Sequence, residues 1–254
     1  MSVTIKSARE IELMREAGRI LAKTHEELAK ALKPGMTTWD IDHLGEELIR
    51  SYGCIPSFKN YNGYPASICV SVNDEVVHGI PSRKHFIEEG DIVSLDAGVI
   101  YKGYHSDAAR TYGIGEISPE AGRLIEVTKQ SFFEGIKFAK AGNHLNDISS
   151  AIQAYAESFG FGVVRDLVGH GIGSHLHEDP EVPNFAGRRR GLKLRPGMTL
   201  AIEPMINEGT PEVVWLDDDW TVVTEDGALS AHYENTVLIT EGEPELLSLV
   251  SEAH

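Results

Sequence analysis

Apolar residues recur at helical spacing in two pairs of segments, one pair in each half of the chain. The first segment begins at a capping box formed by Ser7 and Glu10, and the helix is expected to end near Lys33-Pro34-Gly35. The second helix is predicted to begin after Thr37-Thr38 and to run to about Tyr52-Gly53. The two later helices are predicted over residues 119–140 and 145–159.

Short runs of β-forming residues follow each pair of helices or the loops beside them. They predict strands at Ala66–Val72, Asp91–Val99, Ser106–Thr111, Thr199–Ile206, Glu212–Leu216, Trp220–Val223 and Leu229–Thr240. Helices and strands therefore alternate in blocks, which is the pattern of an α+β (α/β) chain.

The chain carries an internal repeat at an offset of 107 residues. Laying residues 33–53 over 140–160 makes six of 21 positions identical. The same offset lays Gly90–Asp96 over Gly197–Glu203, so each half has an acid at the same point of an apolar strand. We therefore predict one single domain over residues 1–254. It would be made of half-repeats at about 1–115 and 116–254, with a site where the halves meet.

Two of these acids interrupt runs that should be buried strands. Asp96 lies within IVSLDAGVI and Glu203 within TLAIEPMI, where an unpaired carboxylate would be costly or would take up a proton. A hairpin turning at Tyr101–Tyr104 would bring Asp107 beside Asp96. Glu234, within LSAHYENTVLI, supplies a second acid to pair with Glu203. The strands thus predict two acid pairs, one from each half.

Four converging carboxylates repel one another unless cations lie between them. With one neutral histidine added, two divalent ions would balance the four negative charges. Oxygen-rich ligation with one or two imidazoles is typical of Mn, Fe, Co or Zn. The alternative is pairing with buried arginine, but no Lys or Arg follows Arg195 to serve Glu234 locally. The residues favour a dinuclear metal site.

Length and composition narrow the class of protein. The 254 residues are 41% hydrophobic and 24% charged, as in soluble globular proteins. A net charge of -16 argues against DNA or an anionic membrane as the partner. Two cysteines without a C-x-x-C pattern argue against a disulfide framework or a thiolate zinc site. Since neither a signal peptide nor a membrane-length apolar run is found, we expect a cytoplasmic protein.

The histidines give a weaker signal. His170 lies in the glycine-rich run GHGIG, followed by His175 and His177, and glycines on both sides permit a close backbone approach. A functional role and ordinary filling of the core are equally compatible with this pattern. His78 precedes Gly-Ile-Pro on a rigid turn and carries little weight alone. The dinucleotide, Walker and H-E-x-x-H patterns are all missing.

Taken together, these motifs resemble type I methionine aminopeptidases over nearly the whole chain. In order, they are NGYPASIC, VSVNDEVVHGIP, SLDAG, HSDAARTY, GHGIG, HEDPEVPN, TLAIEPM and SAHYENTV. The acids and histidine alone would indicate the wider creatinase and aminopeptidase fold, and YPASIC with HGIP narrows the match. The sequence is similar to the short bacterial form. The resemblance implies a "pita-bread" fold with pseudo-twofold symmetry around a central dimetal site.

The resemblance also implies the residues of the site. The family's metal ligands fall on Asp96, Asp107, His170, Glu203 and Glu234. Its substrate-contacting histidines fall on His78 and His177. The methionine pocket would be lined by Tyr61, Tyr64, Cys69 and Trp220, with Phe58 and Leu176 nearby. Leu176 and Phe58 depart from the family pattern, where Phe and a smaller residue are common, and they bear on pocket shape.

The implied reaction is hydrolysis that removes the initiator methionine from nascent proteins, with a preference for a small second residue. Two divalent ions (Co, Mn, Fe or Zn) with a bridging water would act with Glu203 as proton shuttle. His177 would stabilise the oxyanion and His78 would contact the peptide beyond the cleaved bond. The alternatives are an Xaa-Pro aminopeptidase or prolidase-like peptidase, and a non-catalytic binding protein of the same fold.

One dense basic cluster spans Arg188–Arg195. A solvated loop is its ordinary interpretation. Because nascent polypeptide N-termini are the implied substrate, a transient ribosome contact through this cluster is the alternative hypothesis. We expect the protein itself to be a monomer.

Overall fold

Capping boxes fix the start of the N-terminal helices in this computed structural model, which describes residues 3–249. Ser7 accepts a hydrogen bond from the backbone N–H of Glu10, and Thr37 does the same for Asp40. The four α-helices confirm the predicted ones, although α3 ends earlier than expected. They are α1 (Ala8–Ala31), α2 (Thr38–Ser51), α3 (Pro119–Ile136) and α4 (Leu145–Ser158).

Fifteen strands, most of them short, lie among these helices within residues 3–249. They are β1 (Ile55–Pro56), β2 (Ile68–Val72), β3 (Glu75–Val77), β4 (Ile92–Tyr101), β5 (Tyr104–Gly113), β6 (Gly162–Val163), β7 (Gly169–Gly171), β8 (Glu178–Val182), β9 (Thr199–Ile202), β10 (Met205–Asn207), β11 (Val213–Trp215), β12 (Val222–Thr224), β13 (Ser230–His232), β14 (Asn235–Leu238) and β15 (Glu245–Leu246). The chain thus combines helices with largely antiparallel sheets, as expected for an α+β fold.

The predicted hairpin between the first acid pair is present. Strands β4 and β5 turn at Lys102 and Gly103, whose positive φ angles suit a tight two-residue turn. In this register Asp96 lies opposite Ala109 and Asp107 opposite Gly98. Asp96 and Asp107 are therefore diagonal neighbours on one face of the sheet, as the alternation of the sequence predicts.

Two strand predictions in the second half are wrong in their length. The run Thr199–Ile206 is divided into β9 and β10, because Pro204 cannot donate to the ladder. The run Leu229–Thr240 is divided into β13 and β14 around Tyr233 and Glu234, whose N–H groups bond to Pro204 and Ala109 instead. Both breaks fall at an acid, and each turns that acid out of a regular ladder.

The 107-residue offset recurs in the structure. Helices α2 and α4 begin and end at positions that differ by this number. The loop before each helix repeats as well: Gly35 N–H donates to Ile87 O, and Gly142 N–H donates to Leu194 O. Both glycines have positive φ angles, near 90°, which other residues rarely adopt. The two halves therefore share a backbone pattern down to single hydrogen bonds.

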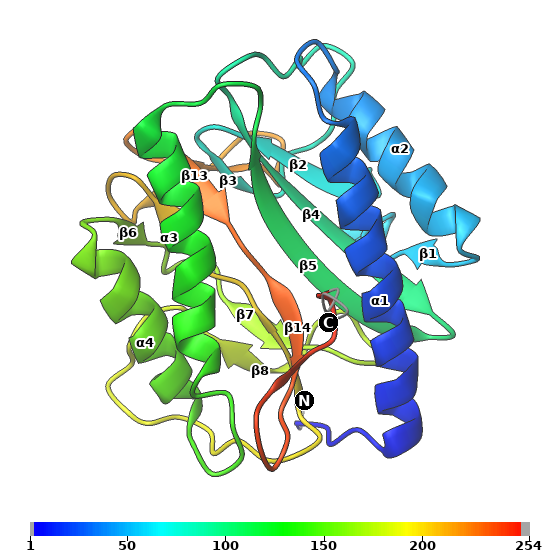
Figure 1. Cartoon of the computed structure of the whole chain (residues 1–254), viewed down its shortest axis with the longest axis vertical. Helices are drawn as coiled ribbons and strands as arrows, with labels where there is room; N and C mark the ends of the chain where they lie inside the picture. Colours follow the sequence, from blue (N-terminus) through cyan, green and yellow to red (C-terminus); the bar gives the residue numbers. More distant parts are fainter. Residues whose placement is uncertain (1–2, 250–254) are drawn as a thin grey trace.

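The site lies where these halves meet. Figure 1 shows α1 and α2 on one side of the molecule and α3 and α4 on the other, with the strands between them. One apolar core joins α1 and α2 to β2 and β4, and includes Leu21, Ile41 and Leu95. A second joins α3 and α4 to β9 and β14, and includes Phe132 and Leu200. Each half thus brings its own rigid scaffold to the boundary.

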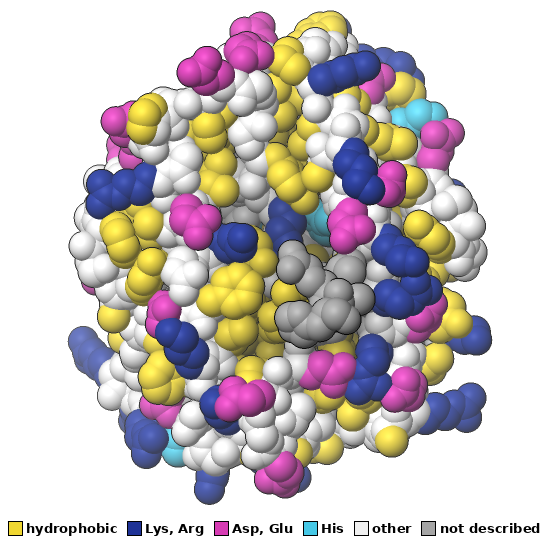
Figure 2. Space-filling view, viewed as in Figure 1, with side chains coloured by type: hydrophobic (Ala, Val, Ile, Leu, Met, Phe, Trp, Pro, Cys, Tyr) yellow, Lys and Arg dark blue, Asp and Glu magenta, His cyan; other side chains and the backbone are white. Residues whose placement is uncertain are grey.

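The exterior agrees with the mixed composition. On the face seen in Figure 1, basic and acidic side chains are interspersed rather than gathered in one patch (Figure 2). Over residues 3–249, none of the helices has both the length and the apolar character needed to cross a membrane.

A buried histidine in α1 predicts how stability depends on pH. The His25 Nε2–H donates to Ala108 O at 2.9 Å, and burial, with Arg110, lowers the pKa of this imidazole to about 3. Its folded-state pKa lies below its ordinary value of 6.5, so its contribution is complete above pH 6.5 and declines as pH falls towards 3. When the pH falls from 7 to 5, the free energy of unfolding of the parent should decrease by about 2 kcal/mol more than that of His25→Gln, which lacks this imidazole.

Urea denaturation of the metal-free protein at both pH values measures this difference. His43→Gln is the matched control, because the His43 side chain is 53% exposed. A His25→Gln variant with the parent's pH dependence would contradict the assignment.

Candidate metal centre and active site

Four carboxylates and one imidazole converge between the two halves of the fold. Asp96 and Asp107 come from the β4–β5 hairpin, His170 from β7, Glu203 from the break after β9, and Glu234 from the break before β14. His170 Nε2 lies 3.9 Å from Asp107 Oδ2 and 3.6 Å from Glu203 Oε1. Ligand atoms of Asp107, His170 and Glu234 all lie within 4.8 Å of one another. The two acid pairs predicted from separate strands therefore meet.

The local backbone presents His170 in the form that a metal needs. Its Nδ1–H donates to Gly171 O at 2.9 Å, which leaves the lone pair of Nε2 facing the carboxylates. A Cβ at Gly171 would overlap the backbone of Asp179 on the neighbouring strand β8. The glycines around His170 are therefore required by strand packing, which the sequence pattern alone left open.

In the described part of the chain, no lysine or arginine forms an ion pair with the four carboxylates. Within residues 3–249, their only ion-pair partners are histidines. Arg110 lies close by but donates to the backbone oxygen of Glu234 and to Asn235 Oδ1. Asp96 Oδ1, Asp107 Oδ1 and Glu234 Oε1 are buried, and none of them has a hydrogen-bond partner among the described residues. The four carboxylates therefore do not pair with a buried arginine within residues 3–249, which was the alternative to a metal site.

The electrostatics of the cluster favour a bound cation. Burial raises the pKa of Asp96 to about 7; the nearby His232 opposes this rise and Glu203 adds to it. Burial also raises the pKa of Glu203 to about 8. Burial and the neighbouring acids also hold the pKa values of Asp107 and Glu234 well above the ordinary range. Burial lowers the pKa of His170 to about 3, so it is a neutral ligand. Carboxylate oxygens with one neutral imidazole fit a divalent transition metal.

A cavity of about 160 Å³ adjoins this cluster. A space of this size holds one side chain or small ring rather than a peptide. Every residue that the resemblance assigned to the metal site or the substrate pocket lines it. They are Phe58, Tyr61, Tyr64, Cys69, His78, Asp96, Asp107, His170, Leu176, His177, Glu203, Trp220 and Glu234.

Aromatic rings shape the apolar side of this cavity. Tyr64 and Trp220 pack edge to face with centroids 5.1 Å apart, and His78 lies edge to face with Trp220 at 6.3 Å. His78 has a positive φ of 60°, which is uncommon for a residue with a side chain. Burial and the nearby His232 and His177 lower the pKa of His78 to about 4. The imidazole is therefore neutral.

His177 is held by contacts on both sides of its ring. Tyr61 Oη lies 2.7 Å from His177 Nδ1, and the His170 ring packs against it with centroids 4.2 Å apart. Burial lowers the pKa of His177. If the Tyr61 hydroxyl donates to Nδ1, the proton of the neutral imidazole is on Nε2, which can then donate a hydrogen bond.

Two residues of the site were not predicted from the sequence. Asn62 lines the cavity and has a positive φ of 48°. His232 is 2% exposed, and neither ring nitrogen has a hydrogen-bond partner in the part of the chain that the structure describes. Its Nε2 lies 3.6 Å from Glu203 Oε2. The sequence offered one signal for His232: it lies two residues before Glu234, and residues two apart in a strand share a face.

Comparison with known proteins places this site in a family. Residues 12–241 match metallopeptidase family M24. A methionine aminopeptidase of Clostridium acetobutylicum is 59% identical over 247 residues, which are 97% of this chain and 99% of that protein. The crystal structure of a methionine aminopeptidase from Thermotoga maritima has a TM-score of 0.96 at 46% identity, over 98% of this chain and 100% of that one.

The same fold occurs in an Xaa-Pro dipeptidase from Bacillus anthracis. It has a TM-score of 0.79 at 26% identity, covering 98% of this chain but only 63% of that one. These similarities confirm the pita-bread fold expected from the sequence. Full-length similarity at high identity is to the methionine aminopeptidases. The chain therefore belongs to metallopeptidase family M24, a family of hydrolases, and within it to the methionine aminopeptidases.

Proposed function

We propose that this protein removes the N-terminal methionine from nascent polypeptides by metal-dependent hydrolysis. One observation carries the proposal: a single small cavity joins four carboxylates and His170 to a pocket lined by aromatic rings and Cys69. Such a pocket suits the flexible, polarisable thioether of methionine. The relative from Clostridium acetobutylicum, named a methionine aminopeptidase, supports the same activity.

Two divalent ions, of Mn, Fe, Co or Zn, are the proposed cofactor. Asp96, Asp107, His170, Glu203 and Glu234 would hold them, and the partnerless carboxylate oxygens among these residues support this assignment. When bound, such ions lower the pKa of a water molecule and polarise a carbonyl group.

Three side chains of the site would transfer the proton, stabilise the oxyanion and contact the peptide. Glu203, whose two carboxylate oxygens face His170 and His232, would take a proton from the attacking water and pass it to the leaving amine. His177 would donate from Nε2 to the developing oxyanion, while Tyr61 holds Nδ1. His78 would contact the peptide beyond the cleaved bond.

The pocket residues would set the substrate preference. Tyr61, Tyr64, Cys69 and Trp220 would surround the methionine side chain, with Phe58 and Leu176 closing the space. Phe58 and Leu176 are 8% and 2% exposed, so both are packed rather than free to swing aside. A small second residue is proposed because the cavity leaves little further room.

Because nascent chains are the proposed substrate, the enzyme would act in the cytoplasm. It would act as a monomer, without DNA or membrane partners. Arg188, Arg189 and Arg190 are exposed, which supports a transient ribosome contact by the Arg188–Arg195 cluster. Replacing these bases should reduce cosedimentation with ribosomes in low salt. Cosedimentation that persists unchanged would remove this contact.

The proposed activity is tested on the protein after metal removal and separate readdition of Mn, Fe, Co and Zn. Met-Ala-Ser should release free methionine, while an Ala-Pro peptide and N-formyl-Met-Ala-Ser should not be cleaved. Cleavage of the proline peptide alone would favour the prolidase-like alternative, which shares the fold. Metal binding without cleavage of any peptide would favour a binding protein.

A further inference from the structure

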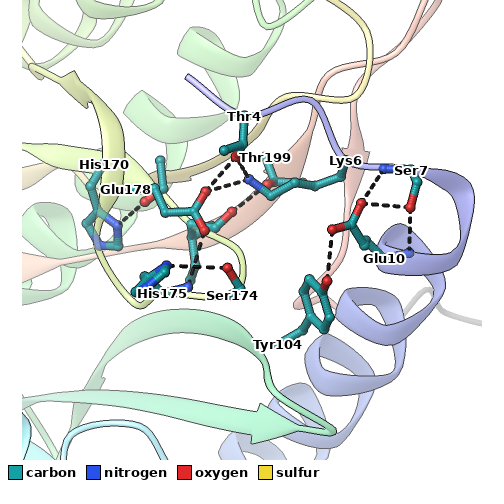
Figure 3. Close-up of polar contacts among 12 residues, drawn as sticks. Thr4, Lys6, Ser7, Glu10, Tyr104, His170, Ser174, His175, Glu178 and Thr199 are labelled. Atoms are coloured by element: carbon teal, nitrogen blue, oxygen red, sulfur yellow. Dashed lines mark hydrogen bonds and ion pairs between the residues drawn. The ribbon is translucent and has the colours of Figure 1, made fainter. Parts of the chain in front are cut away.

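The N-terminal arm that precedes α1 reaches across to the loop beside the candidate site. Lys6 Nζ lies 2.6 Å from Glu178 Oε2, and the two side chains are only 5% and 7% exposed. Thr4 Oγ1 also donates to Glu178 Oε2, at 2.7 Å, and accepts a hydrogen bond from Lys6 Nζ. Figure 3 shows these groups converging on the Glu178 carboxylate from one side. An ion pair of this burial is unusual on a protein surface.

The other carboxylate oxygen of Glu178 faces the loop itself. Glu178 Oε1 accepts a hydrogen bond from the backbone N–H of His175 at 3.2 Å. Glu178 directly follows His177 and pairs with Gly171 in the β7–β8 ladder. The carboxylate therefore joins the N-terminal arm to the segment that carries His177.

The arm is a fixed point for this connection. Lys6 N–H donates to Gly197 O at 2.8 Å, and the capping box at Ser7 follows immediately. Glu10, in that box, accepts a hydrogen bond from the Tyr104 hydroxyl at 2.8 Å (Figure 3). A Cβ at Gly173 would overlap Lys6 Cε, so the loop makes room for the lysine stem.

Removing the lysine would free this segment. Glu178 would be left as a buried charge without its cation, which is strongly unfavourable and favours a shift of the loop towards water. The His177 ring would then depend on Tyr61 and on packing against His170. A displacement of about 1 Å at such a group can cost on the order of 10²-fold in rate.

We propose that Lys6 is a positioning residue that acts through Glu178 to hold His177 in register with the substrate. The inference rests on the proposed peptidase function, in which His177 contacts the reacting carbonyl. Lys6 and Glu178 are 172 positions apart in the chain. The N-terminal arm is thereby part of the active-site support.

The first test is the steady-state kinetics of Lys6→Met on Met-Ala-Ser with saturating metal. We expect kcat to fall by about 10- to 100-fold and KM to change by less than about threefold, because His177 acts on the transition state. Lys6→Arg should recover part of kcat, since it restores the cation. Lys30→Met is the matched control, because its pair with Glu27 is exposed, and it should keep the parent's kcat.

The decisive test repeats Lys6→Met in a His177→Ala background. If Lys6 acts through His177, the second substitution should lower kcat by less than about twofold there. An equal loss in both backgrounds would overturn the proposal, because Lys6 would then act through the metal ligands or the fold. A parallel loss of bound metal, measured by elemental analysis, would overturn it as well.

An activity-independent measurement separates this proposal from the proposed function. In long-range ¹H–¹⁵N spectra of the histidine rings, the His177 signals are assigned by their loss in His177→Ala. Lys6→Met should shift or broaden them, and unchanged signals would refute the positioning role. If Lys6→Met does not fold, Glu178→Gln, which removes the charge but keeps the side chain's length, should give the same spectral change. If the parent enzyme does not cleave Met-Ala-Ser, that result would contradict the proposed peptidase function but not the positioning of His177 by Lys6.

Discussion

Glu203→Gln is expected to lower kcat on Met-Ala-Ser by about 10²- to 10⁴-fold, the usual contribution of a positioned acid–base group. The amide keeps the size of the side chain but cannot accept and release a proton at the pH of the assay. Glu203 Oε1 lies 3.6 Å from His170 Nε2 and Oε2 lies 3.6 Å from His232 Nε2, so both carboxylate oxygens face the site. Steady-state kinetics with metal content measured in the same samples tests this.

The control separates proton transfer from metal binding. Glu212→Gln changes an exposed acid of the same half and should leave kcat unchanged. If Glu203→Gln retains bound metal and full turnover, Glu203 is not the proton shuttle. If it loses metal in proportion to its activity, ligation is the main role of Glu203 and the shuttle assignment fails.

Much of the first half of the site could be predicted from local rules. Asp96 and Asp107 meet because strand alternation and a two-residue turn fix which side chains share a face. The capping box at Ser7 and Glu10 predicted the start of α1 in the same way. These features depend on residues close together in the chain, so the sequence pattern contains the necessary information.

The second acid pair depends on contacts that no local pattern contains. Glu203 and Glu234 were expected within continuous strands, yet each lies at a break where Pro204 and Tyr233 bond to each other across the sheet. His170 lies in a strand of only three residues, whose place is set by β8 and β9. The strand pattern indicated Glu203 and Glu234 as an acid pair. For His170 it left a functional role and ordinary core filling equally compatible, and only the resemblance to a known family assigned this residue to the metal.

The same reasoning explains the residues that were missed. His232 was not predicted as a site residue, because alternation does not show that the chain breaks between it and Glu234. Lys6 and Glu178 are each unremarkable in the sequence, and only the tertiary fold makes them a buried pair.

Asp107→Asn is expected to abolish most of the metal-induced stabilisation of the protein. The ligand atoms of Asp107, His170 and Glu234 lie within 4.8 Å of one another. The backbone of Asp107 makes two hydrogen bonds with Thr236 Oγ1, so an asparagine should keep the same position. If metal affinity falls about 100-fold, a concentration of 100 times the parent's Kd stabilises the parent by about 2.7 kcal/mol but the variant by only about 0.4. The melting temperature should therefore rise by about 5 to 10 °C in the parent and by about 1 °C in the variant.

The metal-free variant sharpens this prediction. Four carboxylates with raised pKa values destabilise the empty cluster, so removing one should leave the metal-free melting temperature unchanged or higher. Asp166→Asn, at an exposed acid, should respond to Mn²⁺ as the parent does. A metal response of parental size in Asp107→Asn would show that the ion is held elsewhere. A large drop in the metal-free melting temperature would instead show that Asp107 stabilises the fold, contrary to the repulsion inferred from its neighbours.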